Sequence, residues 1–457
     1  MRLSRVLRPD RAELRSMVRL ALPIVGVQLG TQSMGLVDTI MVGHISAHVL
    51  AAVALGNLYF FNVVIFGTGV LMALDPIVSQ ALGAGDHDDV SRALQRALVL
   101  ALLLTAFSIA LLAPAGPILR WFHQPPDILD DARKYLLISI AGVLPYFVFV
   151  VLRQTLQAMS RVAPVVATLL IANATNAGLN WVFVYGHLGS PPLGAPGSAI
   201  ATAASRWLMA LLVAALTWPR LRGYMHRVSP RALEPGAVWR MLRLGAPIGG
   251  QQMLEVGAFG AIGLLMGALG TIPMAAHQIA ITLASLTFMV PVGVGSAAAV
   301  RVGLAIGAGD RPRASAAVHA AYVCGVGFMV CTAALFLLAP RALALAFTGD
   351  ARVVALAVVL IPIAGVFQIF DGAQAVGAGV LRGAGDTKAP LLVMLGAYWL
   401  LGIPVSGYLG LRTPWGAAGL WFGFVVSLAC VAFFLLARIR VVFRRGVNRL
   451  QIDSPAA

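Results

Sequence analysis

Two carboxylates stand inside apolar stretches of this sequence. Glu255 lies in GGQQMLEVGAFGAIGLLMG (249–267) and Asp371 in VFQIFDGAQAVGAGVLRGAG (366–385), with no basic residue near Glu255 on its own helix. A carboxylate at mid-membrane costs about 2.5–3.5 kcal/mol on insertion scales, so it usually faces a polar cavity and binds something. If these two acids lie close together, they repel unless a cation or a proton lies between them. Carboxylate oxygens suit a hard cation, so we expect Glu255 and Asp371 to share one Na⁺ or H⁺.

A second polar group is expected in the first half of the chain. Asp38 lies in GLVDTIMVG, and Asn176 and Asn180 lie in NATNAGLNWVFVYG. The two asparagines are four residues apart, which places them on one face of a helix. We expect Asp38, Asn176 and Asn180 to form one cluster. The alternative is that the asparagines only hydrogen-bond neighbouring helices, as such side chains often do in membranes.

Further polar residues lie in or beside apolar runs. Arg206 either pairs with an acid of the first half or lines a cavity, and the sequence does not decide between these roles. Gln278 is a possible cavity residue. Its neighbour His277 is more typical of a packing or hydrogen-bonding residue than of a metal ligand. Asp75, just before Pro76, is expected at a membrane interface.

The composition indicates that these residues belong to a membrane protein. The chain has 457 residues, of which 60% are hydrophobic and 11% charged, and its mean hydropathy is +0.89. A soluble domain carries about 25% charged residues. Apolar runs of roughly 20 residues recur along the whole length, which indicates many membrane-spanning helices. The net charge of +16 is explained by basic residues between these runs, so nucleic-acid binding is not expected. No cofactor is expected, and the three cysteines are interpreted as core residues.

The apolar runs predict an all-α integral membrane protein with about twelve transmembrane helices. The predicted spans are 17–43, 48–78, 92–114, 132–153, 163–186, 196–217, 242–267, 274–303, 316–339, 353–380, 389–410 and 415–437.

The distribution of arginine predicts the orientation of these helices. Arginines are frequent in residues 2–19, 220–243 and 438–449, whereas the loops GHISAH, GHLGSPPLGAPG and GALGTIP have no Lys or Arg. Basic residues concentrate in cytoplasmic loops. Both termini and the central segment are therefore expected in the cytoplasm, with the protein in a bacterial inner membrane. The loops after the third and ninth spans weaken this contrast, because they also carry basic residues.

An internal repeat appears when the chain is shifted on itself by 224 residues. LALPIVGVQL (20–29) then falls on LGAPIGGQQM (244–253), and ALGAGD (81–86) falls on AIGAGD (305–310). We expect an N-terminal six-helix lobe (1–217), a cytoplasmic linker (218–241) and a C-terminal six-helix lobe with a basic tail (242–457). An even number of helices returns each half to its starting side, so the repeats are parallel, an architecture typical of secondary transporters.

Several motifs together resemble the multidrug and toxic compound extrusion (MATE) family, in its bacterial NorM-like branch. They are GLVDTIMVGHISA, LNWVFVYG, MLEVGAF, AAHQIAITLASL and FDGAQAVGAGVLRGAGDTKAP. The resemblance implies two six-helix lobes around a central cavity, and export of drugs driven by inward flow of Na⁺ or H⁺. It also implies that Glu255 and Asp371 form the cation site of the C-terminal lobe, and that Asp38, Asn176 and Asn180 form the polar cluster of the N-terminal lobe.

The sequence departs from the family pattern at three places. NorM-like pumps often have Tyr four residues before the second acid, where this chain has Phe367, so one candidate oxygen is missing. Gln157-Ala158 replaces a common Glu-Gly pair. Asn180 stands where the proton-driven DinF-like branch has Asp, which argues against purely N-lobe proton coupling.

The sequence favours a monomeric exporter of amphipathic organic cations over two other functions. A flippase for lipid-linked precursors would need several arginines for an anionic headgroup, but acids predominate in the spans, with Arg206 as the exception. A membrane prenyl transferase would need clustered acids such as DDxxD, and the acid pairs 88–89 and 130–131 lack that spacing. No Walker motif is present, so ATP is not the expected energy source. The sequence does not choose between Na⁺ and H⁺.

Overall fold

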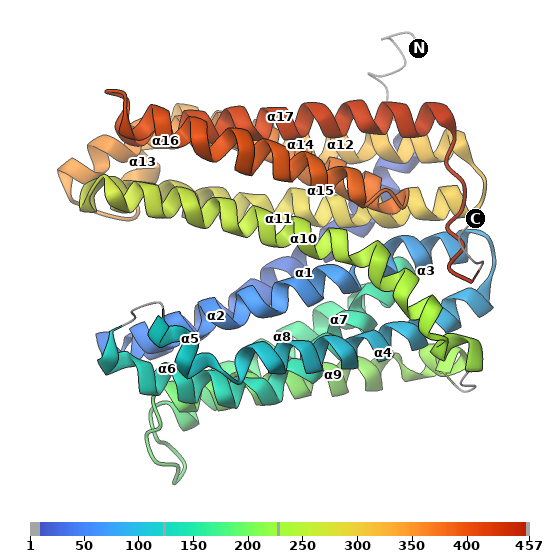
Figure 1. Ribbon diagram of the computed structural model, residues 1–457, viewed down its shortest axis with the longest axis horizontal. Helices are drawn as coiled ribbons and strands as arrows, with labels where there is room; N and C mark the ends of the chain where they lie inside the picture. Colours follow the sequence, from blue (N-terminus) through green and yellow to red (C-terminus); the bar gives the residue numbers. More distant parts are fainter. Residues whose placement is uncertain (1–9, 122–124, 226–228, 454–457) are drawn as a thin grey trace. The chain divides into compact units, whose positions relative to one another are not determined.

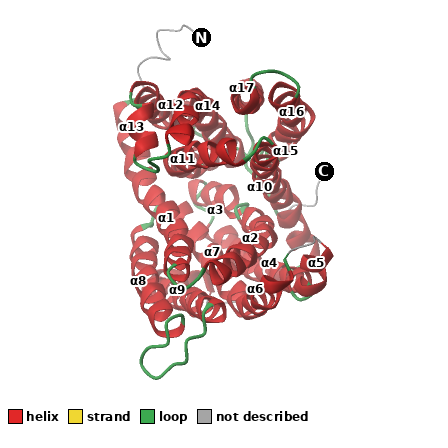
Figure 2. Ribbon diagram, turned by 90° about the vertical axis from the view of Figure 1, so that its left-hand side faces the viewer, coloured by secondary structure: helices red, strands yellow, loops and turns green. Residues whose placement is uncertain are grey.

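The computed structural model describes residues 10–121, 125–225 and 229–453, and every regular element in these ranges is a helix (Figures 1 and 2). Helices satisfy all their backbone hydrogen bonds internally, which is what a chain without access to water requires. The elements are α1 (Arg11–Gly43), α2 (Ala47–Leu71), α3 (Leu74–Gly83), α4 (His87–Leu112), α5 (Ala115–Trp121), α6 (Pro126–Ser139), η2 (Ile140–Gly142), α7 (Val143–Ala158), α8 (Ala163–Phe183), α9 (Ala195–Met225), η3 (Pro230–Leu233), α10 (Pro235–Ala268), α11 (Thr271–Gly307), α12 (Arg311–Leu338), α13 (Pro340–Leu345), α14 (Ala351–Gly383), α15 (Lys388–Met394), η4 (Leu395–Gly402), α16 (Ile403–Leu411) and α17 (Gly416–Arg445).

The predicted spans correspond to these helices. In the described part of the chain, 11 continuous helical stretches are long and apolar enough to cross a membrane. The remaining predicted span, 242–267, falls in α10, which is long enough but less apolar because it contains Gln251, Gln252 and Glu255. The predicted span 48–78 is divided into α2 and α3, with a break before Pro76.

The two GAGD turns, one in each repeat, have the same backbone conformation and the same helix cap. Gly85 and Gly309 have φ values of +73° and +70°, which L side chains rarely adopt. The following Asp86 and Asp310 cap α4 and α12, and each carboxylate accepts the N–H three residues later at 2.9 Å. Equivalent sequence therefore produces equivalent helix starts in both halves.

The described chain divides into two compact units. Unit 1 comprises the described residues up to Val25, Gly83–Gly85 and Gly250–Leu450, and unit 2 comprises Gly26–Leu82, the described part of Asp86–Gly249, and 451–453. In unit 1, α11 and α14 pack so closely that a side chain on Gly379 would meet the Gly295 carbonyl. Small residues at such crossings allow helix backbones to approach closely in membranes.

The first helix of each repeat is divided between the two units. The boundaries, Val25/Gly26 in α1 and Gly249/Gly250 in α10, are equivalent positions under the 224-residue shift. Within unit 2, a Cβ on Gly69 would lie 2.5 Å from the Gly249 Cα. Within unit 1, a Cβ on the equivalent Gly293 would lie 2.5 Å from Val25 Cγ2. Each repeat therefore contributes the beginning of its first helix to the other unit.

Two acids near the beginning and the end of the described chain, Glu13 and Asp453, form ion pairs within the units. In unit 1, the buried Glu13 carboxylate of α1 accepts two hydrogen bonds from Arg301 of α11, at 2.7 and 2.5 Å. In unit 2, Asp453 of the tail lies 2.5 Å from Arg92 and also accepts a hydrogen bond from Arg96. Burial alone would raise the pKa of Asp453, but the hydrogen bond and charges of Arg96 and Arg92 outweigh it and hold that pKa below its ordinary value.

Candidate functional site

Unit 1 brings the two acids of the opening motifs together. Glu255 lies on α10 and Asp371 on α14, one turn before Gln374. The Gln374 amide nitrogen donates to Glu255 Oε1 at 2.9 Å and to Asp371 Oδ1 at 3.3 Å. Asp371 and Gln374 are buried, with 2% and 1% of their surface exposed, while Glu255 is partly exposed. The two carboxylates therefore lie on either side of a single amide.

Aromatic side chains in the same unit include the residue that replaces the expected tyrosine. Phe367 contacts Trp421 and Phe424 with ring centroids 5.3 Å away in each case, and Phe259 at 6.0 Å. It supplies no oxygen, as the sequence indicated. Tyr398 also borders this cluster, 5.9 Å from the Phe424 ring. Phe367 is one helical turn before Asp371 and Phe259 is one turn after Glu255, so the cluster adjoins both acids along their own helices. An apolar neighbourhood strengthens electrostatic interactions.

Unit 2 brings together Asp38, Asn176 and Asn180, and adds Thr202. Asn180 donates to Asp38 Oδ1 at 2.7 Å, and Thr202 donates to Asp38 Oδ2 at 2.6 Å. Asn176 contacts the same threonine hydroxyl at 3.5 Å. All four side chains are buried, with at most 4% of their surface exposed. Both oxygens of Asp38 are thus satisfied by neutral donors from α8 and α9.

The other polar residues take different places. The Arg206 guanidinium lies over the Phe60 ring, 4.0 Å from its centroid, and within the described chain it has no ion pair with an acid. Gln278, a possible cavity residue, is exposed on α11, and its amide nitrogen donates to the Thr282 hydroxyl at 3.4 Å. Asp75, expected at an interface, is fully buried, because α3 packs into the protein.

Three uncharged residues of these clusters were missed by sequence reasoning: Gln374, Tyr398 and Thr202. Gln374 gives a local signal, since it stands one helical turn after Asp371 and therefore shares its face. Thr202 and Tyr398 come from helices far from their partners in sequence, and nothing in the local pattern distinguishes them from packing residues.

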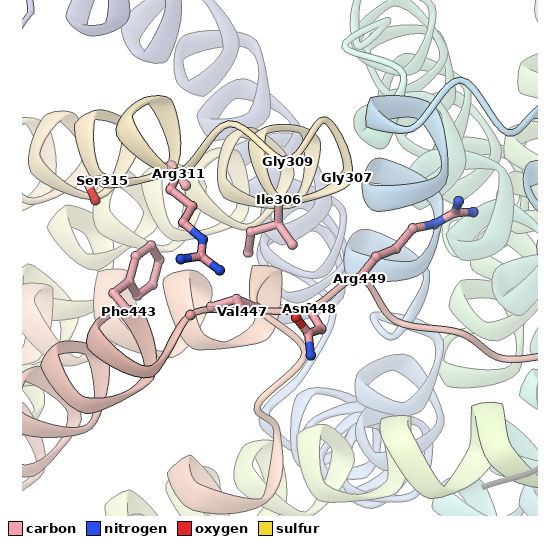
Figure 3. A pocket seen from close by; sticks show the side chains of 11 residues that line it. Ile306, Gly307, Gly309, Arg311, Ser315, Phe443, Val447, Asn448 and Arg449 are labelled. Atoms are coloured by element: carbon pink, nitrogen blue, oxygen red, sulfur yellow. The ribbon is translucent and has the colours of Figure 1, made fainter. Parts of the chain in front are cut away.

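The structure also contains a cavity of about 380 Å³ away from both clusters, within unit 1. The turn between α11 and α12 and the segment after α17 form it. Arg311 points toward Phe443 and Val447, whereas Arg449 points away (Figure 3). None of the candidate residues predicted from the sequence lines this cavity.

The helices, the repeat and the two polar clusters define a multi-pass, two-repeat α-helical membrane protein. Comparisons with known proteins give its family. The MatE family model matches residues 23–182 and 247–407, so it recognises each repeat separately. The chain belongs to the MatE family, the multidrug and toxic compound extrusion proteins.

Relatives and solved structures resemble the chain over nearly its whole length. It is 37% identical over 442 residues to the probable multidrug resistance protein NorM of Rhizobium meliloti (strain 1021), covering 94% of each chain. It is 34% identical over 440 residues to the multidrug resistance protein MdtK of Edwardsiella ictaluri (strain 93-146), covering 95% of this chain and 96% of that one. The crystal structure of the eukaryotic MATE transporter AtDTX14 superposes with a TM-score of 0.85 at 24% identity, covering 95% and 97% of the two chains. This last similarity shows the fold.

Proposed function

We propose that this chain is a multidrug efflux transporter that exchanges amphipathic organic cations for Na⁺ or H⁺ by alternating access. It works as a monomer in a bacterial inner membrane, with both termini in the cytoplasm. Substrates are small molecules, and no reaction is catalysed. The relatives named as multidrug resistance proteins support the export of drugs over the flipping of lipid-linked precursors.

The Gln374 amide between Glu255 and Asp371 is the observation that carries this proposal. Two carboxylates this close in an apolar surrounding need positive charge between them in at least one state of the protein. A driving ion supplies that charge. An exporter must link ion binding to drug binding, and two ligands are linked when each biases the same equilibrium between two conformations.

The test is ethidium transport in proteoliposomes under an imposed Na⁺ gradient or an imposed H⁺ gradient, applied separately. Wild-type protein should transport ethidium under at least one of them. Glu255→Gln and Asp371→Asn should each abolish gradient-driven transport while reconstituting normally. Either single change should cost nearly as much as both together, because the two groups act as one site.

The matched control is Asp127→Asn, which removes an exposed acid and should transport ethidium like wild type. A second measurement is release of bound ethidium from purified protein on adding Na⁺ or on acidification. If Glu255→Gln releases the dye as readily as wild type does, Glu255 is not part of the coupling site.

A further inference from the structure

The acid pair in unit 1 is accompanied by two neutral oxygens that have no partner among the described residues. The Gln374 amide oxygen is buried and accepts no hydrogen bond, although the nitrogen of the same amide contacts both carboxylates. The Tyr398 hydroxyl is also buried without a partner, on a residue with 0% exposed surface. Buried polar atoms are nearly always hydrogen-bonded, so two exceptions beside one acid pair call for an explanation.

The segment that holds Tyr398 packs beside Glu255, because the next residue, Trp399, donates to the Leu254 carbonyl of α10 at 3.1 Å. At this position Tyr398 interacts electrostatically with both Glu255 and Asp371. The hydroxyl of Tyr322, on α12, is also buried without a partner among the described residues, although its side chain is partly exposed, and it has no such interaction with the acids. The orphaned hydroxyl of Tyr398 is therefore distinguished by its position beside the carboxylates.

The backbone around Tyr398 is also unusual. Residues Leu395–Gly402 form a π-helix, η4, between α15 and α16. π-helical turns are rare and occur frequently at functional sites. Ser427 of α17 donates to the Ala397 carbonyl at 2.7 Å, which holds the segment in place. The π-helix is a second, independent indication that Tyr398 is positioned for a ligand.

We propose that the Gln374 amide oxygen and the Tyr398 hydroxyl complete an alkali-cation site with Glu255 and Asp371. This inference rests on the proposed function, because the ion would be its driving ion. Carboxylate, amide and hydroxyl oxygens are all hard ligands of the kind that hard cations prefer. Tyr398 supplies its hydroxyl from η4, a different element from the two helices that carry the acids.

In this site the side-chain amide of Gln374 has two orientations, one with the nitrogen and one with the oxygen toward the carboxylates. Its NH₂ group lies between the carboxylates in the structure, where it partly satisfies both. Rotation of the amide by half a turn exchanges nitrogen for oxygen and turns an acceptor toward the same space. That orientation repels two carboxylates unless a cation lies among the three groups, so cation binding and amide rotation are coupled. The residue is neutral, so the rotation changes the site without changing its net charge.

The test measures Na⁺ binding to purified protein without drug. NaCl is titrated against choline chloride at constant ionic strength and pH, with intrinsic tryptophan fluorescence as the signal. Trp399, in the same π-helix, donates to the Leu254 carbonyl next to Glu255 and is the local reporter. Wild type should show a saturable response to Na⁺ that choline does not produce.

The variants are Tyr398→Phe, which removes only the hydroxyl, and Gln374→Met, which removes both amide heteroatoms at similar length. Each should raise the apparent Kd for Na⁺ about tenfold, as loss of one polar contact to a charge predicts. Tyr322→Phe is the matched control for a buried, unpartnered hydroxyl and should bind Na⁺ like wild type. Equilibrium ethidium binding and the elution profile establish that each variant is folded.

The outcomes separate this inference from the proposed function. If Tyr398→Phe and Gln374→Met bind Na⁺ as tightly as wild type while Glu255→Gln does not, the two additional ligands are refuted and the acid pair stands. If wild type gives no response specific to Na⁺, the alkali-cation site is refuted as well. Ethidium transport driven by a proton gradient would still support the proposed function in that case. Absence of transport under either gradient refutes the proposed function itself.

Discussion

The Asp38 carboxylate differs from the Glu255–Asp371 pair in the partners it already has. Neutral donors from Asn180 and Thr202 satisfy its two oxygens at 2.7 and 2.6 Å, and no second acid in the described part of the chain shares these donors. The repeat places Ile262 at the equivalent position of unit 1, where it is buried. The scaffold therefore does not require an acid at this point of the fold.

Asp38→Asn should consequently insert into the membrane at near-normal levels and lose most resistance to cationic drugs. The amide keeps one acceptor for Asn180, and the Thr202 hydroxyl can turn to accept from the new NH₂, so the network stays satisfied while the charge is lost. Growth of drug-sensitive cells in several cationic drugs, with membrane immunoblots, measures both effects. Full resistance in this variant would show that Asp38 has no part in transport.

How far the sequence predicts the site depends on the kind of residue. Buried acids are costly in a membrane, so Glu255, Asp371 and Asp38 stand out without any structure. Gln374, Thr202 and Tyr398 carry no such cost, and their roles depend on which helices meet. The contact of Arg206 with the Phe60 ring could not be predicted from the sequence either, because it depends on the packing of α9 against α2.

At the scale of elements, the glycines of the divided first helices offer a matched pair of tests. Gly69→Ala and Gly293→Ala should each destabilise the protein by about 1–3 kcal/mol, because the new methyl group overlaps atoms of α10 or α1. Thermal unfolding in detergent measures this. Gly26→Ala is the control and should be tolerated, since nothing lies within 4 Å of its Cβ position.

A second substitution should relieve the steric overlap at Gly293 but not the overlap at Gly69. The first atom met at Gly293 is Val25 Cγ2, so Val25→Ala should partly restore Gly293→Ala. At Gly69 the first atoms met belong to the Gly249 backbone, which no substitution removes. Unchanged stability in both alanine variants would contradict the close packing described for these helices.

Helix positions were predicted well because lipid demands long apolar helices. Breaks within them were not. The division between α2 and α3 comes just before Pro76, and the π-helix η4 comes just before Pro404. Proline ends or kinks a helix at the residues that precede it, but a count of apolar residues does not show such breaks. The hydropathy of α10 is low because Glu255 and two glutamines interrupt its apolar sequence. One of these polar residues, Glu255, belongs to the candidate site.

For the whole molecule, the arginine distribution makes a prediction about sidedness. The loop between α8 and α9 extends beyond the helices and contains no Lys or Arg (Figure 2). In a cysteine-free background, Pro191→Cys should react with an impermeant maleimide in intact cells, whereas Glu234→Cys should react only after permeabilisation. Both positions are exposed. The opposite pattern would invert the proposed topology.

The division of α1 and α10 at equivalent positions bears on how such a chain could originate. In a single six-helix ancestor with this packing, the beginning of the first helix would have had no surface of its own unit to pack against. Two copies would have had to exchange these helix ends, and such an exchange of identical elements makes a domain-swapped homodimer. Gene duplication and fusion would then have made the exchange permanent within one polypeptide. Neither half of the present gene should therefore encode an autonomous module, and a split gene should restore the protein only when both fragments are synthesised together.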